Sequence, residues 1–161
     1  MLRRKKTKAA ALLAGCAMMA MAVFAPAAVG LHDGCSLVER LLYPFFHANL
    51  LHAALNVYVL WSLVFLFDTS AGMLAASYAI AVCYPYGSPS LTVGLSGVVY
   101  ALMAFVVPQV SNKLQYIAFV SLYILIGFAF PVFNNLLHVW CFVIALVIVL
   151  IYEKGNTLRL S

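Results

Sequence analysis

The sequence contains very little charge. Only 8% of its 161 residues are charged, and Asp and Glu together account for four of them. Hydrophobic residues make up 66% of the chain, and the mean hydropathy is +1.08. This composition excludes a soluble globular domain and indicates a polytopic membrane protein. Because a bilayer core about 30 Å thick requires roughly 20 apolar residues per helix, the length allows about six spans and no soluble domain.

Paired cysteines and intramembrane carboxylates are also missing. The four cysteines are widely separated, and their spacing indicates no disulfide framework. No Asp or Glu falls within an expected span, which argues against a proton relay and against a carboxylate metal site. We therefore expect neither a metal nor a cofactor.

Positive charge is concentrated at the N-terminus. Most of the net charge of +5 comes from Arg3, Arg4, Lys5, Lys6 and Lys8. In a soluble protein this charge would suggest nucleic acid as a partner, but ahead of an apolar run it is a topology signal. The later basic residues agree, since Lys113, Lys154 and Arg159 fall on the same side of a six-span scheme and only Arg40 falls on the other. Both termini are therefore expected in the cytoplasm, with the chain in a bacterial-style inner membrane.

Apolar runs separated by turn signals predict an all-α fold. Residues 1–8 are expected to form a basic cytoplasmic N-terminus, residues 9–152 a six-helix membrane domain and residues 153–161 a polar cytoplasmic tail. The expected spans cover residues 9–29, 47–67, 71–84, 94–107, 114–130 and 136–152.

The first apolar run has three interpretations. We favour a transmembrane helix, because the apolar region of a signal peptide is usually about 7–15 residues and this run is longer. A signal peptide cleaved at Ala25-Pro26-Ala27 is the second interpretation, and a lipoprotein processing box at Leu13-Ala14-Gly15-Cys16 is the third. All three leave the basic end in the cytoplasm.

The fourth run opens with a serine between glycines, at Gly94, Ser96 and Gly97. A helix start offers backbone N–H groups without partners and the positive end of the dipole, so an oxyanion formed beside Ser96 would find donors there. The run itself is roughly 21 Å long, too short for a core of about 30 Å, which predicts a water-accessible cavity above the serine. Taken alone, the stretch also fits a helix-packing face.

Histidine and asparagine open two further runs. His47, His52 and Asn56 begin the second run, and His138 begins the sixth. On a helix His52 and Asn56 share a face, whereas His47 is rotated by about 140° from His52. The second, fourth and sixth runs point in the same direction, so all these groups and Ser96 are expected at one depth. A serine, a histidine and oxyanion donors at one level are the components of acyl transfer.

The order and spacing of these motifs resemble the rhomboid family of intramembrane serine proteases. The resemblance covers residues 9–152 and is carried by His47, His52, Asn56, Gly94, Ser96, Gly97, Tyr100 and His138. It implies a six-transmembrane-helix rhomboid-like bundle in which Ser96 and His138 form a catalytic dyad without a carboxylate. It also implies that the partners are the lipid bilayer and transmembrane protein substrates, cleaved near the outer membrane face, with no nucleic acid.

The resemblance also assigns supporting roles. Tyr100 is expected to pack against the imidazole of His138, and His52 and Asn56 are expected to join the backbone N–H of Ser96 in an oxyanion hole.

Four other positions concern packing rather than chemistry. Residues 31–46 are expected to form an outer loop, and His47 is expected to brace it. The sequence departs from the family pattern at Glu39, where an aromatic residue is common, and at Cys141 and Ala145, where the last helix usually carries glycine. Cys141 and Ala145 are small, so close packing of the last helix on the fourth is still expected.

Two functions of other classes stay open. A bis-histidine haem protein would use two of His47, His52 and His138 and would be coloured. A catalytically inactive rhomboid-like protein would bind membrane-protein clients, although the presence of both Ser96 and His138 favours the protease. A zinc protease is disfavoured, because no glutamate follows the first histidine at the required spacing.

Overall fold

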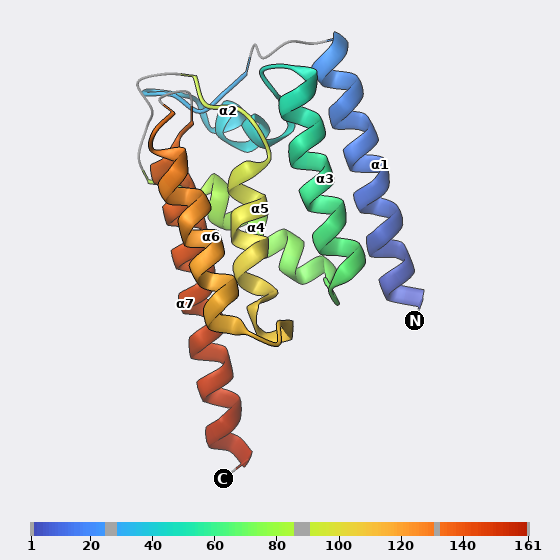
Figure 1. Ribbon diagram of the computed structural model, residues 1–161. Helices are drawn as coiled ribbons and strands as arrows, with labels where there is room; N and C mark the ends of the chain where they lie inside the picture. Colours follow the sequence, from blue (N-terminus) through green and yellow to red (C-terminus); the bar gives the residue numbers. More distant parts are fainter. Residues whose placement is uncertain (1, 25–28, 86–90, 131–132, 161) are drawn as a thin grey trace.

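The part of the chain that the structure describes is all-helical, as predicted. The structure is a computed structural model that describes residues 2–24, 29–85, 91–130 and 133–160. Its α-helices are α1 Leu2–Phe24, α2 Leu37–Leu42, α3 Leu50–Leu66, α4 Ala71–Val82, α5 Ser96–Phe105, α6 Lys113–Gly127 and α7 Asn135–Leu160 (Figure 1). Two short 3₁₀ helices, η1 Tyr43–Phe45 and η2 Val107–Gln109, follow α2 and α5.

Helix α5 lies at the centre of the bundle (Figure 1). It packs against α7, α4 and α3, while α1 packs along α3 and α6 packs along α7. Helices α3, α5 and α7 all begin at the end of the molecule that carries α2. The start of α1 and the end of α7 lie at the opposite end. The first turns of α3, α5 and α7 are thus placed at one level.

Side-chain caps explain where most helices begin. Five of them start after a Ser or Asn whose side chain accepts a hydrogen bond from a backbone N–H three residues on, which satisfies a donor that has no partner within the helix. These residues are Ser36 for α2, Asn49 for α3, Ser70 for α4, Asn112 for α6 and Asn134 for α7. The predicted third and fifth spans match α4 and α6 to within a few residues.

Four predicted boundaries were wrong. Helix α1 begins at Leu2, so the basic residues expected ahead of the first helix lie within it. The cap at Asn49 starts α3 at Leu50, so His47 lies before the helix and not within it. Gly94 has a φ of +116°, which is incompatible with an α-helix, and α5 therefore begins at Ser96. Helix α7 continues to Leu160, so the expected polar tail continues the last helix.

Residues 31–46, the expected outer loop, contain helices that were not predicted from the sequence. Ser36 and Glu39 form a capping box that starts α2. Pro44 then falls in the first turn of η1, where a missing N–H costs no hydrogen bond.

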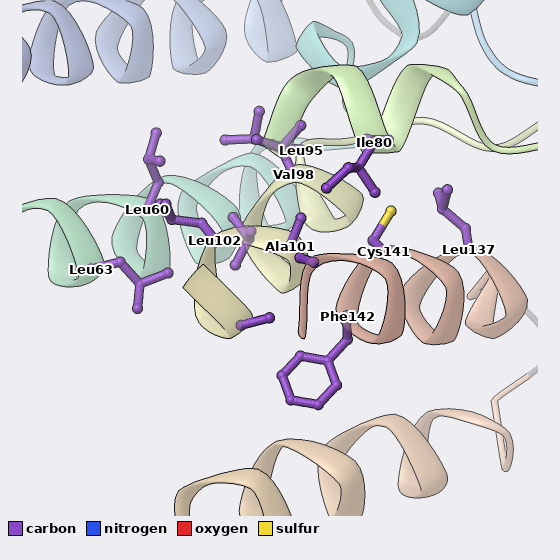
Figure 2. Packing of buried hydrophobic residues seen from close by; sticks show 14 of the residues in the cluster. Leu60, Leu63, Ile80, Leu95, Val98, Ala101, Leu102, Leu137, Cys141 and Phe142 are labelled. Carbon is purple, nitrogen blue, oxygen red and sulfur yellow. The ribbon is translucent and has the colours of Figure 1, made fainter. Parts of the chain in front are cut away.

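The core is built around α5 (Figure 2). Ala101 and Leu102 are fully buried, between Leu60 on α3, Ile80 on α4 and Cys141 on α7. Small residues permit this approach: a Cβ atom placed on Gly97 would lie 3.3 Å from Sγ of Cys141 and 3.4 Å from Cβ of Ala81. Cys141 and Ala145 have no exposed surface. The two residues that depart from the family pattern therefore still allow α7 to pack closely on α5.

Two helical segments among the described residues are long and apolar enough to cross a membrane, Lys5–Val23 and Asn135–Gly155. A third span results if Leu37–Phe45 and Leu50–Leu66, which meet at an angle of 80°, are counted together. Helices α4, α5 and α6 are apolar but have only 12, 10 and 15 residues. The predicted set of six spans is therefore met only in part, by an apolar helical bundle with two or three helices of full membrane length.

The contact between α1 and α3 depends on one glycine. Nε1 of Trp61 donates to the carbonyl oxygen of Ala11 at 3.0 Å, and a Cβ atom on Gly15 would lie 2.6 Å from the same Nε1. The proposed lipoprotein box thus falls inside α1 with its glycine against Trp61. The alternative cleavage site at Ala25-Pro26-Ala27 lies outside the described residues.

Replacing Gly15 with leucine should separate α1 from α3. The larger side chain cannot fit against Trp61, and we expect a loss of about 1–3 kcal/mol of stability from overpacking. Tryptophan fluorescence should also change, because Trp61 loses its bond to Ala11. Gly72→Leu is the matched control, since its nearest neighbour lies 3.6 Å away at Ser70. Equal melting temperatures for the Gly15 and Gly72 variants would contradict this packing.

Candidate active site

Ser96 and His138 meet where α5 and α7 begin. Ser96 is the first residue of α5, and His138 lies in the first turn of α7, 42 residues later. Oγ of Ser96 is 2.9 Å from Nε2 of His138, a normal hydrogen-bond length. His138 is 8% exposed, and Ser96 is half-buried. The structure thus brings together the two residues predicted as a dyad.

Tyr100 covers the histidine ring. It lies one turn after Ser96 on α5, and its ring centroid is 4.5 Å from that of His138, with 30° between the planes. A tilted ring contact at this distance restricts rotation of the imidazole. The predicted contact between Tyr100 and His138 is therefore present.

Two histidines hold the loop that leads into α5. The backbone N–H of Leu95 donates to Nε2 of His47 at 3.3 Å. A Cβ atom on Gly94 would lie 2.7 Å from Cε1 of His52, so the His52 ring packs directly on the Gly94 backbone. The N–H of Gly94 also donates to the carbonyl oxygen of Tyr43 at 3.1 Å. The turn before Ser96 is fixed from several sides.

The predicted orientation of His47 was wrong. The rings of His47 and His52 lie edge to face, with centroids 5.2 Å apart, whereas a shared helix would have turned them away from each other. His47 precedes the Asn49 cap, so helical geometry does not apply to it. Its hydrogen bond braces the Gly94–Leu95 turn from the end of the outer loop.

Backbone donors lie next to the serine. The first intrahelical bond of α5 runs from the N–H of Val99 to the carbonyl of Leu95, and no side chain in the described residues caps this helix. The N–H groups of Ser96 and Gly97 therefore have no partner within the helix. Asn56 is placed differently, because its Nδ2 donates to the carbonyl oxygen of His52 at 3.0 Å. Its hydrogen bond goes to the α3 backbone and not to the dyad.

Thr92 is a residue near the site that was not predicted from the sequence. This residue forms an isolated antiparallel bridge with Leu31, with N···O distances of 2.8 Å and 2.9 Å, and its hydroxyl accepts a bond from Asn134. The outer loop is thereby joined to the segment that carries the nucleophile. No local pattern signals such a pairing, since Leu31 and Thr92 meet only after the helices have packed.

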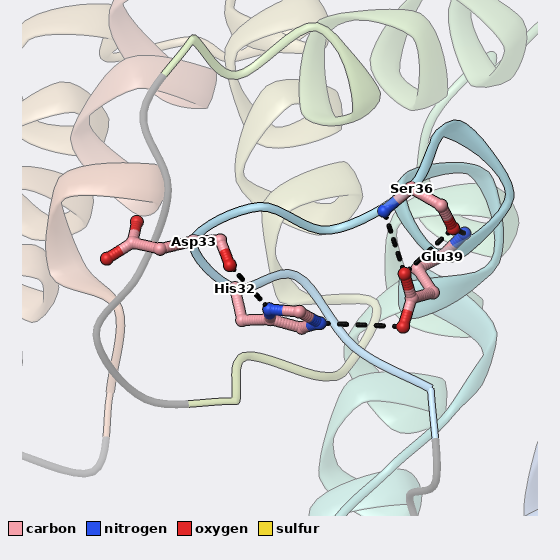
Figure 3. A network of polar contacts seen from close by, with 4 residues as sticks. All are labelled: His32, Asp33, Ser36 and Glu39. Atoms are coloured by element: carbon pink, nitrogen blue, oxygen red, sulfur yellow. Dashed lines mark hydrogen bonds and ion pairs between the residues drawn. The ribbon is translucent and has the colours of Figure 1, made fainter.

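A polar network around His32 organises the outer loop (Figure 3). Nδ1 of His32 lies 2.8 Å from the carbonyl oxygen of Asp33, and Nε2 lies 3.4 Å from Oε1 of Glu39. Both partners are acceptors, so only the doubly protonated imidazolium donates to both. Oε2 of Glu39 accepts from the N–H and the hydroxyl of Ser36, each at 2.7 Å. His32 is the residue after Leu31, so this network lies next to the bridge between Leu31 and Thr92.

The outer loop should be best ordered in mildly acidic solution. The Asp33 carbonyl and then the Glu39 carboxylate raise the pKa of His32 above 6.5. The stabilisation of the loop by protonated His32 is therefore fully present below pH 6.5 and is lost as the pH rises through the raised pKa. Ser36 and then His32 lower the pKa of Glu39 below 4.5. The stabilisation of the loop by ionised Glu39 is therefore lost only as the pH falls through this lowered pKa.

Hydrogen exchange tests this pH dependence. After correction for intrinsic rates, amides of residues 31–42 should be most protected near about pH 5–6 and less protected above about pH 8. His32→Gln should remove the difference. Equal protection of the wild-type loop at both pH values would contradict the role of His32.

The described residues offer little to a metal. No group of three or more His, Cys, Asp or Glu side chains among them could hold an ion, and Cys16, Cys35, Cys83 and Cys141 are free thiols. Of the histidine nitrogens that could bind a haem iron, Nε2 of His138 contacts Ser96 and Nε2 of His47 accepts from Leu95.

Comparison of the chain with protein-family models, curated proteins and solved structures gave no match. The assignment of a function thus depends on this chain's own residues. The strongest feature is the hydrogen-bonded pair Ser96 and His138, surrounded by Tyr100, His52 and the start of α5.

Proposed function

We propose that this chain is a rhomboid-type intramembrane serine endopeptidase with a Ser96–His138 dyad. The observation that carries this proposal is the 2.9 Å contact between Oγ of Ser96 and Nε2 of His138, side chains from two helices that begin at one level. A serine hydroxyl is a weak nucleophile until a base accepts its proton. An imidazole at hydrogen-bond distance, held by a stacked tyrosine, is such a base.

The reaction would proceed by acyl transfer. Oγ of Ser96 attacks the scissile carbonyl carbon while its proton passes to Nε2 of His138. The C–N bond of the tetrahedral intermediate then breaks, and His138 gives the proton to the leaving amine. Water attacks the resulting acyl-enzyme, with His138 again accepting and returning a proton, which frees Ser96 and the second product.

The tetrahedral oxyanion requires donors. The N–H groups of Ser96 and Gly97 are the best placed by sequence and by their lack of intrahelical partners. We assign the third donor to the His52 ring, which packs on the Gly94 backbone. Asn56 would contribute indirectly, through its bond to the His52 carbonyl.

We also propose that α1, α3, α4, α5, α6 and α7 cross the membrane as six spans. Helix α5 has 10 residues and is only about 15 Å long, half of a bilayer core. The backbone on either side of it would therefore lie at membrane depth, which is tolerated where protein buries it. Leu95 is 5% exposed and Val107 2% exposed, which supports this placement.

The substrate class follows from the same arrangement. The dyad lies at the end of the bundle that carries α2, opposite the start of α1 and the end of α7. Helix α6, which begins with Lys113, starts at that opposite end, and Lys8 donates to the carbonyl oxygen of Phe65 near the end of α3; the positive-inside rule would make this end cytoplasmic. Substrates would be transmembrane proteins cut near the outer face of an inner membrane, with both of this chain's termini cytoplasmic.

A fluorophosphonate probe tests the proposal on the purified full chain. Wild-type protein should be labelled covalently at Ser96, and Ser96→Ala and His138→Ala should not be labelled. Equal labelling of all three proteins, or none of the wild type in either detergent or liposomes, would overturn the dyad. The second of these results, together with capture of membrane proteins by the wild type, would favour the inactive client-binding alternative.

A further inference from the structure

A second hydrogen bond lies parallel to the dyad. Nδ2 of Asn134 donates to Oγ1 of Thr92 at 3.2 Å, four residues before the contact between Ser96 and His138. Both pairs are separated by 42 residues in the sequence. The segment that leads into α5 and the start of α7 are therefore joined twice, once by the dyad and once by Asn134 and Thr92.

The helix that Asn134 caps sets the orientation of its amide. Oδ1 accepts from the N–H of Leu137 at 3.1 Å, and the Asn134 carbonyl accepts from the N–H of His138 at 3.3 Å. Because Oδ1 is needed as the cap, Nδ2 must be the atom that faces Thr92. One side chain thus fixes both where α7 begins and how far it lies from the nucleophile segment.

Thr92 is itself held in place. Its backbone N–H and carbonyl both bond to Leu31, and two residues later Gly94 bonds to Tyr43. The bond from Asn134 is therefore anchored on a segment that is already tied to the outer loop, and it can transmit a fixed separation to α7.

We propose that Asn134 is a positioning residue for the dyad: through its bond to Thr92 it sets the separation at which His138 reaches Ser96. This inference rests on the proposed function. Asn134 touches neither reacting atom and acts through the placement of His138. A displacement of about 1 Å between reacting groups can cost on the order of 100-fold in rate, so a modest shift of α7 has a large effect.

Asn134→Ser separates the two tasks of this residue. Serine keeps a side-chain oxygen for the cap but has no amide to reach Thr92. In labelling of the full chain by the fluorophosphonate probe, we expect the maximal rate to fall about 10- to 100-fold, with the half-saturating probe concentration changed by less than about 2-fold. Because the cap remains, the melting temperature should change little.

Variants at Thr92 test the same bond from the other side. Thr92→Val should lower the maximal labelling rate as Asn134→Ser does, while Thr92→Ser, which keeps the hydroxyl, should restore most of it. The double variant Asn134→Ser with Thr92→Val should be no slower than the slower single variant, because both changes break one interaction. Additive losses would overturn the proposed coupling.

Asn112 provides a matched control. It caps α6 through the same two groups, with Oδ1 accepting from the N–H of Gln115 and Nδ2 donating to Oε1 of Gln115. Asn112→Ser makes the same chemical change away from the dyad, and labelling should proceed at the wild-type rate. A loss equal to that of Asn134→Ser would show that any cap substitution slows the protein, and would overturn the inference.

The proposed function and this inference fail in different ways. Ser96-dependent labelling that is unchanged in Asn134→Ser would support the proposed protease function and refute the positioning role. If the wild type shows no such labelling, the protease function is refuted. The ¹⁵N chemical shift of Nε2 of His138 then tests the inference by itself. A shift that changes in Asn134→Ser but not in Asn112→Ser supports it, and a shift that is the same in all three proteins refutes it.

Discussion

Replacing Ser96 or His138 with alanine will lower the rate of peptide-bond hydrolysis by at least about 10⁴-fold, and replacing both will lower it no further. The two side chains share one hydrogen bond and one proton transfer, so when either is removed the other can no longer take part in the reaction. The losses are therefore not additive. Cleavage of a transmembrane peptide that carries a fluorophore and a quencher on either side of its outer end, in proteoliposomes, measures all three variants.

Ser62 supplies the control for this experiment. It lies on α3, where its hydroxyl donates to the carbonyl of Tyr58 at 2.8 Å. Ser62→Ala removes a membrane-helix hydroxyl without touching the dyad and should retain full activity. Residual hydrolysis in Ser96→Ala above about 1% of the wild-type rate would mean that another group is the nucleophile.

Replacing Gly94 with alanine will have the second largest effect. At a φ of +116° an L-residue is strained by about 1–3 kcal/mol, and the added Cβ would lie 2.7 Å from the His52 ring. Either the turn or the imidazole has to move, and Ser96 lies two residues away. We expect a lower melting temperature together with a loss of hydrolysis on the order of 100-fold.

A Gly34→Ala variant distinguishes the effect of backbone strain from the effect of a steric contact with the added Cβ. Gly34 also has a positive φ, of +77°, but nothing lies within 4 Å of the Cβ that alanine would add. Gly34→Ala should therefore cost about 1–2 kcal/mol of strain and leave hydrolysis near the wild-type rate. If the two alanine variants lose activity equally, the contact between Gly94 and His52 has no part in catalysis.

Local chemistry made much of the fold predictable. The spans expected at residues 71–84 and 114–130 correspond to α4 and α6, since each apolar run is bounded by a capping Ser70 or Asn112. The shared level of Ser96 and His138 was also predictable, because alternate spans point the same way and bring their first turns to one level. That the two side chains form a pair was expected only from the resemblance to the rhomboid family.

The remaining features depend on tertiary contacts or on competition between local signals. His47 was expected on a helix, but the cap at Asn49 excluded it and allowed its ring to meet His52. Thr92 carried no signal, because its partners Leu31 and Asn134 lie 61 and 42 residues away. The end of α7 was misplaced because a polar segment continues a helix when nothing breaks it.

The 42 residues between Ser96 and His138 have a consequence for the newly made protein. At about 5–20 residues per second, a ribosome adds the histidine roughly 2–8 s after the serine. During that interval the nascent chain carries a hydroxyl with no base, and any product that ends before residue 138 stays in that state. Under the proposed function, a nascent chain gains its dyad only after residue 138 has been added, so shorter products would be unable to cut neighbouring proteins in the membrane.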